Sequence, residues 1–411
     1  WLIVNLTVVI IKLDNDGGYN LMLREVKEHL QNNILPFWMG LKDDKHGGFY
    51  GEVGYDQKIN HKSVKGGIYH SRILWFFSNA YLTLKDKLYL DYADHAYDFL
   101  KKSFLDKEYG GIYWTVTYDG KPADDSKHTY NQSFAIYGLA SYYDATGNTE
   151  ALGLAYDIFH KIEDLCKDEG GYLEAFDRSF KPTPNDKLSE NGVMADRTMN
   201  TLLHLLEAYT ELYRVDSKEE VAICIRKMLD MFADKIYNPT LRRLEVFFGL
   251  DWNSLIDLHS YGHDIEASWL IDRTCEVLNE EYYTNKISNI TKDLADHIHK
   301  VALDTDSSVY NESVNGLVDK TKVWWVQAEA ILGFVNGYQV DQTREDYLET
   351  SKNIWAYIKK YIIDPRENSE WLNELYRDGK PIIEKELAGV WKCPYHNGRM
   401  CFELINRKVN L

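Results

Sequence analysis

Stretches that are apolar on almost every side alternate along the chain with stretches that are apolar on one side only. Residues 72–81 and 132–143 are examples of the first kind, and such runs predict helices that are buried over most of their surface. Four more runs of this kind begin near positions 199, 262, 324 and 396. The six starts lie about 60 to 72 residues apart, which is typical of a structural repeat.

A more amphipathic segment, with its charges gathered on one side, precedes these apolar runs. The clear examples are residues 89–104, 149–166, 218–237, 280–302 and 344–363. Six buried and six half-exposed helices in alternation predict an all-α toroid whose buried helices form an inner ring. A helical solenoid is the alternative, but six repeats of about 60 residues is the number that closes a double ring. Because the sequence shows no βαβ alternation and no linker, we expect one domain.

Three loops of the repeat share an Asp followed by a Gly-Gly pair, and the pairs begin at positions 47, 110 and 170. Paired glycines permit positive φ angles, so we expect tight turns followed by short extended segments. The pairs lack the spacing of a phosphate-binding loop, so no nucleotide cofactor is expected. His297 and His299 stand two residues apart on a predicted helix and point in different directions, so no metal site is expected either.

The charge balance limits the class of partner. The 411 residues include 47 Lys and Arg against 64 Asp and Glu, which gives a formal net charge of −17. Nucleic-acid backbones and anionic membranes repel such a chain, so we expect neither as a partner. Aromatic residues make up 14% of the chain, including 30 Tyr and 11 Trp, and flat rings suit the apolar C–H faces of sugars.

The cysteines and the N-terminus bear on location and domain limits. Five widely spaced cysteines with no C-x-x-C pair predict reduced thiols in a cytoplasmic protein. The apolar run over residues 1–11 is too short to span a bilayer, and no basic residues precede it. A helical pattern starts at Met22, so we interpret residues 1–21 as an extraneous segment and residues 22–411 as the single domain. An N-terminal extension that packs on the surface is the alternative.

Polar residues interrupt the apolar runs near the start of the buried helices, where a closed ring would turn them toward one central cavity. Arg72 opens the first run, and later runs contain pairs three or four residues apart, on one helix face. The pairs are Asn200 and His204, His263 and Glu266, Trp325 and Glu329, and His396 and Arg399, with Trp391 shortly before the last pair. One buried His is commonly a hydrogen-bonded core group, but three at equivalent places in three repeats favour a catalytic role.

Three imidazoles in a cavity favour proton-transfer chemistry, because a His side chain both takes and gives a proton near neutral pH. Two imidazoles on opposite sides of a carbon next to a carbonyl can remove a proton from one face and return it to the other, which inverts that carbon. An Arg or the third His can stabilise the oxyanion of the enediolate intermediate. Inverting glycoside hydrolysis is the alternative, with Glu266 and either Glu329 or Asp264 as the carboxylate pair.

Five motifs of the sequence resemble those of the cellobiose 2-epimerases, a family within the N-acylglucosamine 2-epimerase superfamily. They are Ser71-Arg-Ile-Leu-Trp-Phe-Phe-Ser, Met199-Asn-Thr-x-Leu-His-x-Leu-Glu-Ala-Tyr, Ser260-Tyr-Gly-His-Asp-Ile-Glu-Ala-Ser-Trp-Leu, Trp324-Trp-Val-x-Ala-Glu and Trp391-Lys-Cys-Pro-Tyr-His-Asn-Gly-Arg-Met. The resemblance runs from about Met22 to the C-terminus. It implies an (α/α)6 barrel and the reversible conversion of the reducing-end glucose of a β-1,4-disaccharide into mannose, as from cellobiose to glucosyl-mannose or from lactose to epilactose.

Carried over by position, the resemblance makes His263 and His396 the acid and base at C2, while His204 assists ring opening and the enediolate oxygen. Glu266 would orient the neighbouring imidazole and help to open the ring. The implied substrate-binding residues are Arg72, Tyr130, Asn200, Tyr310, Trp325, Glu329, Trp391 and Arg399. Trp325 and Trp391 would stack on the sugars. No cofactor and no metal are implied, and the expected substrates are cellobiose, lactose or mannobiose, bound by a monomer or a weak homo-oligomer.

Several alternatives stay open at this point. An N-acylglucosamine 2-epimerase or a mannose isomerase of the same superfamily would act on other sugars. An inverting (α/α)6-barrel glycoside hydrolase would release glucose, and a binding toroid would hold cellobiose on its Trp rings without proton exchange. Return of the proton to C1 instead of C2 would give a ketose, so some isomerase activity, from lactose to lactulose, is expected beside epimerisation.

Overall fold

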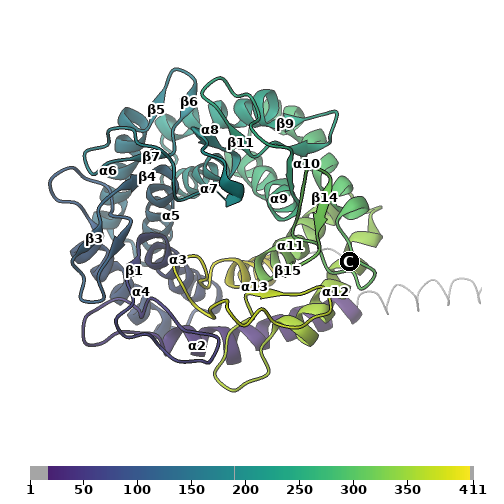
Figure 1. Ribbon diagram of the computed structural model, residues 1–411, viewed down its shortest axis with the longest axis horizontal. Coiled ribbons are helices and arrows are strands. Elements are labelled where there is room, and N and C mark those ends of the chain that lie inside the picture. Colours follow the sequence, from purple (N-terminus) through teal and green to yellow (C-terminus); the bar gives the residue numbers. More distant parts are fainter. Residues whose placement is uncertain (1–16, 189, 408–411) are drawn as a thin grey trace, which may run out of the picture.

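Residues 17–188 and 190–407 are described by the computed structural model, and six of their helices form a closed inner ring (Figure 1). They are α3 (Gly67–Leu84), α5 (Thr129–Thr146), α7 (Met199–Asp216), α9 (Tyr261–Leu278), α11 (Trp324–Val340) and α13 (His396–Asn406). Each packs against the next, and α13 packs against α3, so the ring closes where the C-terminal segment meets the first repeat. The predicted all-α toroid is therefore confirmed as an (α/α)6 barrel.

The outer ring consists of the amphipathic helices, and each packs against an inner one. It begins with a helix over residues 17–29 that continues into η1 (Leu30–Ile34) and α2 (Leu35–Met39). Further around lie α4 (Leu88–Phe99) with η2 (Leu100–Phe104), α6 (Thr149–Leu165), α8 (Glu219–Met231) with η4 (Phe232–Ile236), α10 (Glu281–Val301), and α12 (Glu345–Tyr357) with η5 (Ile358–Ile362). The short helix η3 (Glu190–Gly192) belongs to a loop.

Short antiparallel strands join the loops, and apart from the extended segments expected after the Gly-Gly turns the sequence pattern showed none. They are β1 (Lys65–Gly66), β2 (Thr115–Val116), β3 (Pro122–Asp124), β4 (Lys127–His128), β5 (Lys167–Asp168), β6 (Gly171–Tyr172), β7 (Ala175–Phe176), β8 (Arg197–Thr198), β9 (Tyr237–Asn238), β10 (Arg243–Leu244), β11 (Phe247–Phe248), β12 (Leu258–Ser260), β13 (Glu312–Val314), β14 (Leu317–Asp319), β15 (Lys322–Val323) and β16 (Glu374–Leu375). A strand of two or three residues is too short for the alternation by which strands are recognised.

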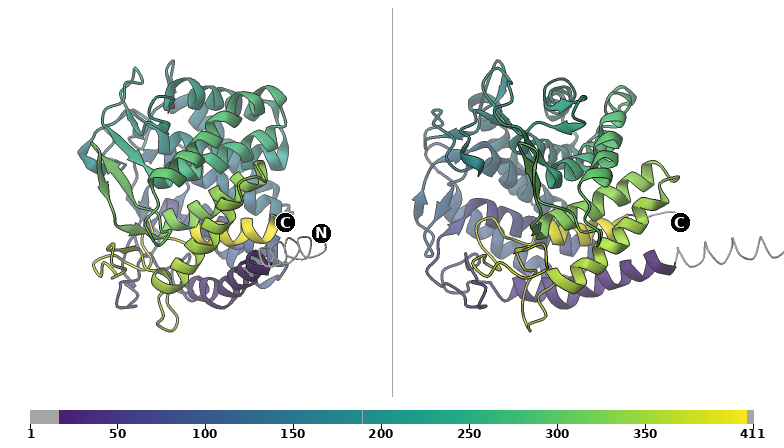
Figure 2. Two further views of the ribbon diagram at one scale, coloured as in Figure 1. Left: turned by 90° about the vertical axis from the view of Figure 1, so that its right-hand side faces the viewer. Right: turned by 45° about the vertical axis from the view of Figure 1, so that its right-hand side comes forward.

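The strand pairs connect neighbouring repeats. The strand before an inner helix pairs with a strand of the following loop, as β1 does with β2, β4 with β7, β8 with β11, β12 with β13 and β15 with β16. A bridge between Val53 and Ala388 joins the first and last loops. Because these strands lead directly into the inner helices, the strands and the N-termini of all six inner helices gather at one end of the barrel (Figure 2).

An ion pair with a buried cation recurs at the position two residues before four of the inner helices. Lys65 donates to Asp43 (2.8 Å), and the equivalent pairs are Lys127 with Asp106 (3.2 Å), Arg197 with Asp168 (2.6 Å) and Lys322 with Asp304 (3.2 Å). The second oxygen of Asp43 accepts from the backbone N–H groups of Lys45 and His46, which shapes the predicted turn. The pair thus fixes each loop to the helix that follows it.

The glycines of the first two of these turns have the predicted positive φ angles, whereas in the third only Gly171 does, with φ of 141°. Gly47 and Gly48 have φ of 85° and 66°, and Gly110 and Gly111 have 80° and 67°. A Cβ on Gly48 would lie 2.5 Å from the Phe99 ring and 2.8 Å from a ring nitrogen of His70. A larger residue would therefore clash with both the outer and the inner helix of this repeat.

The expectation that residues 1–21 form an extraneous segment lies mainly outside the described residues, which begin at 17. Residues 17–21 start the first outer helix, where Tyr19 is buried. The five cysteines are unpaired and buried. Across the described part of the chain, no helix combines the length and apolar character that crossing a bilayer requires.

We predict that Lys65→Met destabilises the fold, because it leaves the fully buried Asp43 carboxylate without its ammonium partner. The expected loss in the free energy of unfolding is about 3 kcal/mol, measured by urea denaturation. Lys58→Met is the control, because the Lys58–Asp56 pair is exposed on both sides and contributes no measurable stability. Equal stability of Lys65→Met and the unmodified protein would show that the pair does not fix the loop.

Candidate active site

A cavity of about 590 Å³ opens at the end of the barrel where the inner helices begin. Eight of the predicted site residues line it, namely Arg72, Tyr130, Asn200, His204, His263, Trp325, Trp391 and His396. Seven of them stand on the inner helices, with at least one on each of the six. Trp391 lies in the loop before the last inner helix. The N-terminus of a helix has a partial positive charge, so the shared end of six helices favours an anion in this cavity.

Four predicted residues do not line the cavity. Glu266, Glu329 and Arg399 lie beneath its floor, each with at most 1% of its surface exposed. The ring of Tyr310 packs against the ammonium of Lys322 at 4.0 Å, in the structural ion pair with Asp304. Its neighbours Asn311 and Glu312 line the cavity instead, so Tyr310 has no place in the site that the structure forms.

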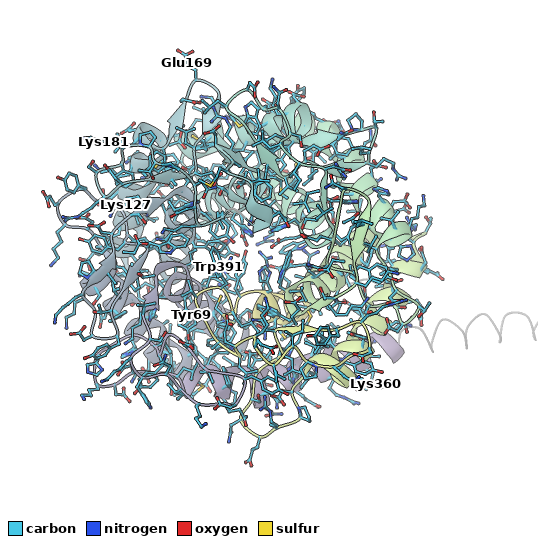
Figure 3. All side chains as sticks on the ribbon, viewed as in Figure 1. Tyr69, Lys127, Glu169, Lys181, Lys360 and Trp391 are labelled. Carbon is cyan, nitrogen blue, oxygen red and sulfur yellow. The ribbon has the colours of Figure 1, made fainter. Side chains whose placement is uncertain are left out.

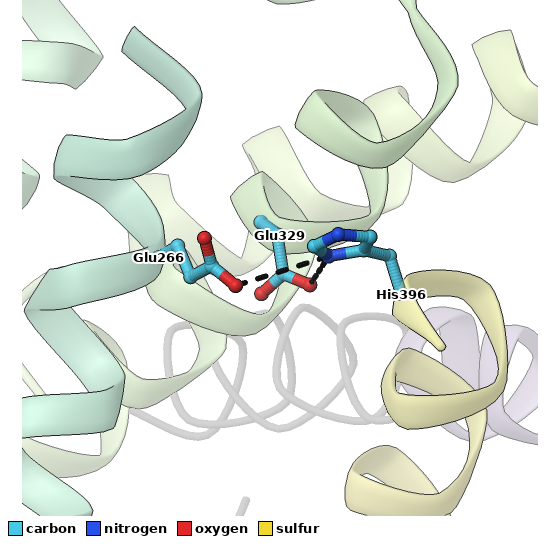
Figure 4. Close-up of side chains that lie close together, drawn as sticks. All are labelled: Glu266, Glu329 and His396. Atoms are coloured by element: carbon cyan, nitrogen blue, oxygen red, sulfur yellow. Dashed lines mark hydrogen bonds and ion pairs between the residues drawn. The ribbon is translucent and has the colours of Figure 1, made fainter. Parts of the chain in front are cut away.

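His396 is oriented by Glu329 (Figure 4). Its Nδ1 lies 2.7 Å from Glu329 Oε1, and the other oxygen of Glu329 accepts from the indole N–H of Trp269 at 3.0 Å. Glu266 is 3.8 Å from the same Nδ1, which is too long for a hydrogen bond. Glu329 therefore orients this imidazole, a role that the sequence did not assign to it. A proton on Nδ1 leaves Nε2 as the nitrogen that exchanges a proton with a ligand.

Arg399 connects the carboxylates beneath the floor. Its Nη1 donates to Glu207 (2.5 Å), and its Nη2 donates to Glu329 (2.7 Å) and to Glu266. Glu266, Glu329 and His396 place three ligand atoms within 4.8 Å of one another, the arrangement of a metal site, but the guanidinium is the cation bound to both carboxylates. Arg399 therefore positions these carboxylates and lies beneath the cavity, outside its lining.

One guanidinium cannot compensate three buried carboxylates. Burial, and then the charge of Glu329, raise the pKa of Glu266 to about 8. Burial also raises the pKa of Glu329. For Glu207, Arg399 and His204 outweigh the effect of burial and lower its pKa to about 2. The floor therefore retains a proton on the Glu266–Glu329 pair at neutral pH, close to the Nδ1 of His396.

His204 has its own carboxylate. Its Nδ1 lies 2.9 Å from Glu207 Oε2, and the same oxygen accepts from the hydroxyl of Tyr395. Its Nε2 lies 4.0 Å from Glu266 Oε2, a buried oxygen without a hydrogen-bond partner. Glu207 fixes the ring so that Nε2 is the nitrogen available to a ligand. Burial lowers the pKa of His204.

His263 differs from the other two imidazoles because its partner is a hydroxyl. Its Nδ1 lies 2.7 Å from Ser260 Oγ. Burial lowers its pKa to about 3, so the ring is neutral at physiological pH. The ring centroids of His263 and His396 lie 4.9 Å and 5.2 Å from the Trp325 ring, so one indole contacts both imidazoles.

Further polar groups in the cavity have free hydrogen-bonding capacity. Arg72 donates to the Tyr130 hydroxyl at 2.8 Å and lies between the rings of Phe134 and Tyr395, but its Nε has no partner. The side-chain oxygen of Asn200 has none either. Unpartnered buried polar atoms are expensive in a protein interior, and ligand hydroxyl groups would satisfy them.

Trp391 stands at the mouth of the cavity. Figure 3 places it at the edge of the central opening, and 42% of its surface is exposed. Its ring lies 5.8 Å from the Trp114 ring and 6.0 Å from the Tyr130 ring. An exposed indole between two other aromatic rings is suited to stack on a sugar.

The structure adds residues that the sequence did not assign. Glu207 stands three residues after His204 in the same motif, and this spacing was the available signal. Ser260 stands three residues before His263, which is the same kind of signal. Tyr395 had no signal, because its contact with Glu207 joins residues from two different repeats.

We predict that the Glu266 carboxyl is protonated at pH 7 and ionises near pH 8. In infrared difference spectra, Glu266→Gln should lose the part of the carboxylic-acid band that disappears around pH 8. Glu211→Gln is the matched control on the same ring of helices, because Arg214 outweighs burial there and lowers the pKa of Glu211. An unchanged band in Glu266→Gln would contradict the proton on the floor.

Comparison with known proteins agrees with this site. The model of the family described as N-acylglucosamine 2-epimerase (GlcNAc 2-epimerase) matches residues 47–398. A cellobiose 2-epimerase from Ruminococcus albus is 50% identical over 391 residues, which are 95% of this chain and all of the relative.

Two solved structures extend the likeness to three dimensions. A sugar epimerase from a ruminal bacterium is 50% identical, with a TM-score of 0.93 over 95% of this chain and 100% of that one. A cellobiose 2-epimerase from Bacillus thermoamylovorans is 46% identical, with a TM-score of 0.91 over the same shares. Both sequence and structure thus align over nearly the whole length, and the chain belongs to the N-acylglucosamine 2-epimerase family, in which these relatives include cellobiose 2-epimerases.

Proposed function

We propose that this protein is a carbohydrate epimerase, a cellobiose 2-epimerase, which inverts C2 of the reducing-end glucose of β-1,4-linked disaccharides. The observation that carries the proposal is the arrangement of His263 and His396, two imidazoles from separate repeats that contact one indole in one cavity. Their unlike partners, a hydroxyl and a carboxylate, give them different affinities for a proton. The named relatives support the same activity.

The reaction begins with an open-chain sugar. In the proposed pose, Arg72 and Asn200 bind the oxygens of the reducing-end unit, and Trp325 supports its apolar face. His204, fixed by Glu207, exchanges the proton that opening of the pyranose ring requires. Opening moves one proton from O1 to O5 of the sugar, so His204 ends this step in the protonation state in which it began, with Glu266 Oε2 4.0 Å from its Nε2.

Proton transfer at C2 then uses the two unlike imidazoles. Neutral His263 takes the C2 proton, and the electron pair of the C–H bond forms the enediolate. Arg72, His204 and the six helix N-termini stabilise the negative charge on the oxygens. After rotation about the C2–C3 bond, His396 in its doubly protonated form gives the Nε2 proton to C2 on the other face and keeps the Nδ1 proton that faces Glu329. When the product leaves, the proton that His263 took from C2 passes through solvent back to His396, so the cycle consumes no proton. In the reverse reaction the two imidazoles exchange roles.

The disaccharide preference follows from the mouth of the cavity. A volume of about 590 Å³ is large for one hexose, and the exposed Trp391 offers a second stacking surface above the floor. We propose cellobiose and lactose as substrates, with mannobiose as a further one, and some release of ketose by protonation at C1. The cavity is built from one chain, so a monomer suffices, and the unpaired cysteines support a reducing, cytoplasmic location.

The hydrolase alternative is not favoured. Inverting hydrolysis needs two carboxylates that face each other across the substrate. Glu266 and Glu329 are both buried and bound to Arg399, and the Asp264 side chain accepts from Leu244 and pairs with His259. None of the three lines the cavity.

Incubation with cellobiose in D2O tests the proposal directly. We expect a mannose-type anomeric signal to grow in the NMR spectrum, with deuterium at C2, and without added nucleotide. Release of glucose without exchange at C2 would contradict the proposal and favour hydrolysis. Binding without any exchange would leave only a carbohydrate-binding protein.

Substitution of either imidazole should greatly reduce turnover and leave the fold intact. For His263→Ala and His396→Ala we expect kcat to fall by roughly 10²–10⁴-fold, the usual contribution of a general acid or base. His160→Ala is the matched control, because this imidazole is half exposed and pairs with Glu220 on the outer surface. Near-normal kcat in either site variant would refute the two-base assignment.

A further inference from the structure

Lys392 is a buried lysine without a hydrogen bond in the described part of the chain. Four lysines are buried there, and Lys65, Lys127 and Lys322 each donate to the loop Asp of their repeat. The Lys392 ammonium has no hydrogen-bond partner, and its nearest carboxylate oxygen, on Glu370, is 4.0 Å away. The repeat therefore does not explain this lysine.

Stability does not explain it either. Glu370 is already satisfied, because it accepts from the Trp38 indole, the Trp371 backbone N–H and the Asn397 amide. An ammonium that leaves water without gaining hydrogen bonds loses free energy on folding. Burial accordingly lowers the pKa of Lys392.

The closest contact of the ammonium leads to the active site. Its Nζ lies 3.9 Å from the centroid of the Trp324 ring, a cation–π contact. Trp324 lines the cavity, and its ring meets the His396 ring edge-on at 5.5 Å. The chain neighbours of Lys392 also belong to the site, since Trp391 stands at the mouth and Cys393 accepts from Arg72.

We propose that Lys392 is a positioning residue for His396, which acts through Trp324. The ammonium fixes the indole that contacts the imidazole, so that Nε2 of His396 faces C2 in the geometry that proton transfer needs. Its positive charge, with Glu370 4.0 Å away, also lowers the affinity of His396 for a proton. The inference rests on the proposed function.

The other charges around His396 are spread over every neighbouring inner helix. They are Glu329 on α11, Glu266 on α9, His204 and Glu207 on α7, Arg72 on α3 and Arg399 on α13 itself. All of these groups remain when Lys392 is replaced. Loss of the Lys392 charge should therefore raise the pKa of His396.

Lys392→Met tests the proposal, because methionine retains an apolar stem against Trp324 and removes the charge. We expect kcat for cellobiose to fall about fivefold or more, because the imidazole is no longer held in place, with a smaller change in KM, because Lys392 also lines the cavity. We expect the His396 titration, followed by ring NMR signals, to move up by about 0.5 pH unit. The melting temperature should fall less than in Lys65→Met, because no hydrogen bond is lost although Glu370 loses its nearest ammonium.

Lys65→Met is the matched control, since it also removes a buried ammonium near an aromatic ring, but one paired with Asp43. It should lower the melting temperature and leave the His396 titration in place. A loss of activity in Lys392→Met that only parallels a lower melting temperature, or an unchanged titration and kcat, would overturn the proposal.

A double-mutant cycle with Trp324→Phe tests the route through the indole. If Lys392 acts through Trp324, the two losses in kcat should be clearly less than multiplicative when combined. Fully independent losses would overturn this route. The NMR titration needs no turnover, so absence of epimerase activity in the unmodified protein would count against the proposed function alone.

Discussion

The charge balance around Arg399 is the constraint on which the site depends. One buried guanidinium meets Glu207, Glu266 and Glu329 from three different inner helices, and each carboxylate also faces an imidazole. Such a cluster is stable only when protons supply the missing positive charge. Burial and the repulsion between carboxylates therefore raise the pKa of Glu266 and of Glu329, which favours a proton on this pair below the imidazoles.

The closed ring gives this cluster its geometry. Residues far apart in sequence meet because each inner helix begins at the same end of the barrel, where strand pairs and Asp–Lys or Asp–Arg pairs fix the loops. The stabilising groups of the loops are kept apart from the catalytic groups, with Lys65 and its equivalents around the ring and the imidazoles inside it. The barrel can thus be rigid although the loops at this end differ from one repeat to the next.

Much of the architecture could be predicted from the sequence, because burial on all sides and burial on one side leave different patterns in a helix. The predicted outer helices agree with the observed ones to within a few residues, as for residues 344–363 and the observed Glu345–Ile362. The first inner helix begins earlier than predicted, at Gly67 rather than Arg72, since the small and polar residues before Arg72 hide the start. The two-residue strands left no pattern to detect.

Sequence spacing also placed eight residues in the cavity, but it could not rank neighbours in space. Glu266 and Glu329 stand on adjacent helices at similar depth, and only their distances to His396, 3.8 Å and 2.7 Å, show which one orients it. Tyr310 and Arg399 were expected to touch substrate because a motif records position and not direction. Lys392 follows Trp391 directly, yet only the contact with Trp324 distinguishes it from an ordinary loop lysine.

The central claim is that two imidazoles with unlike partners stand on opposite faces of C2. The most direct measurement is a crystal structure with the reduced, open-chain alcohol of cellobiose, which cannot react. The account predicts that its C2 lies between the Nε2 atoms of His263 and His396, at near-attack distances of about 3–3.5 Å. A bound alcohol whose C2 has both imidazoles on one face, or neither within reach, would contradict the account.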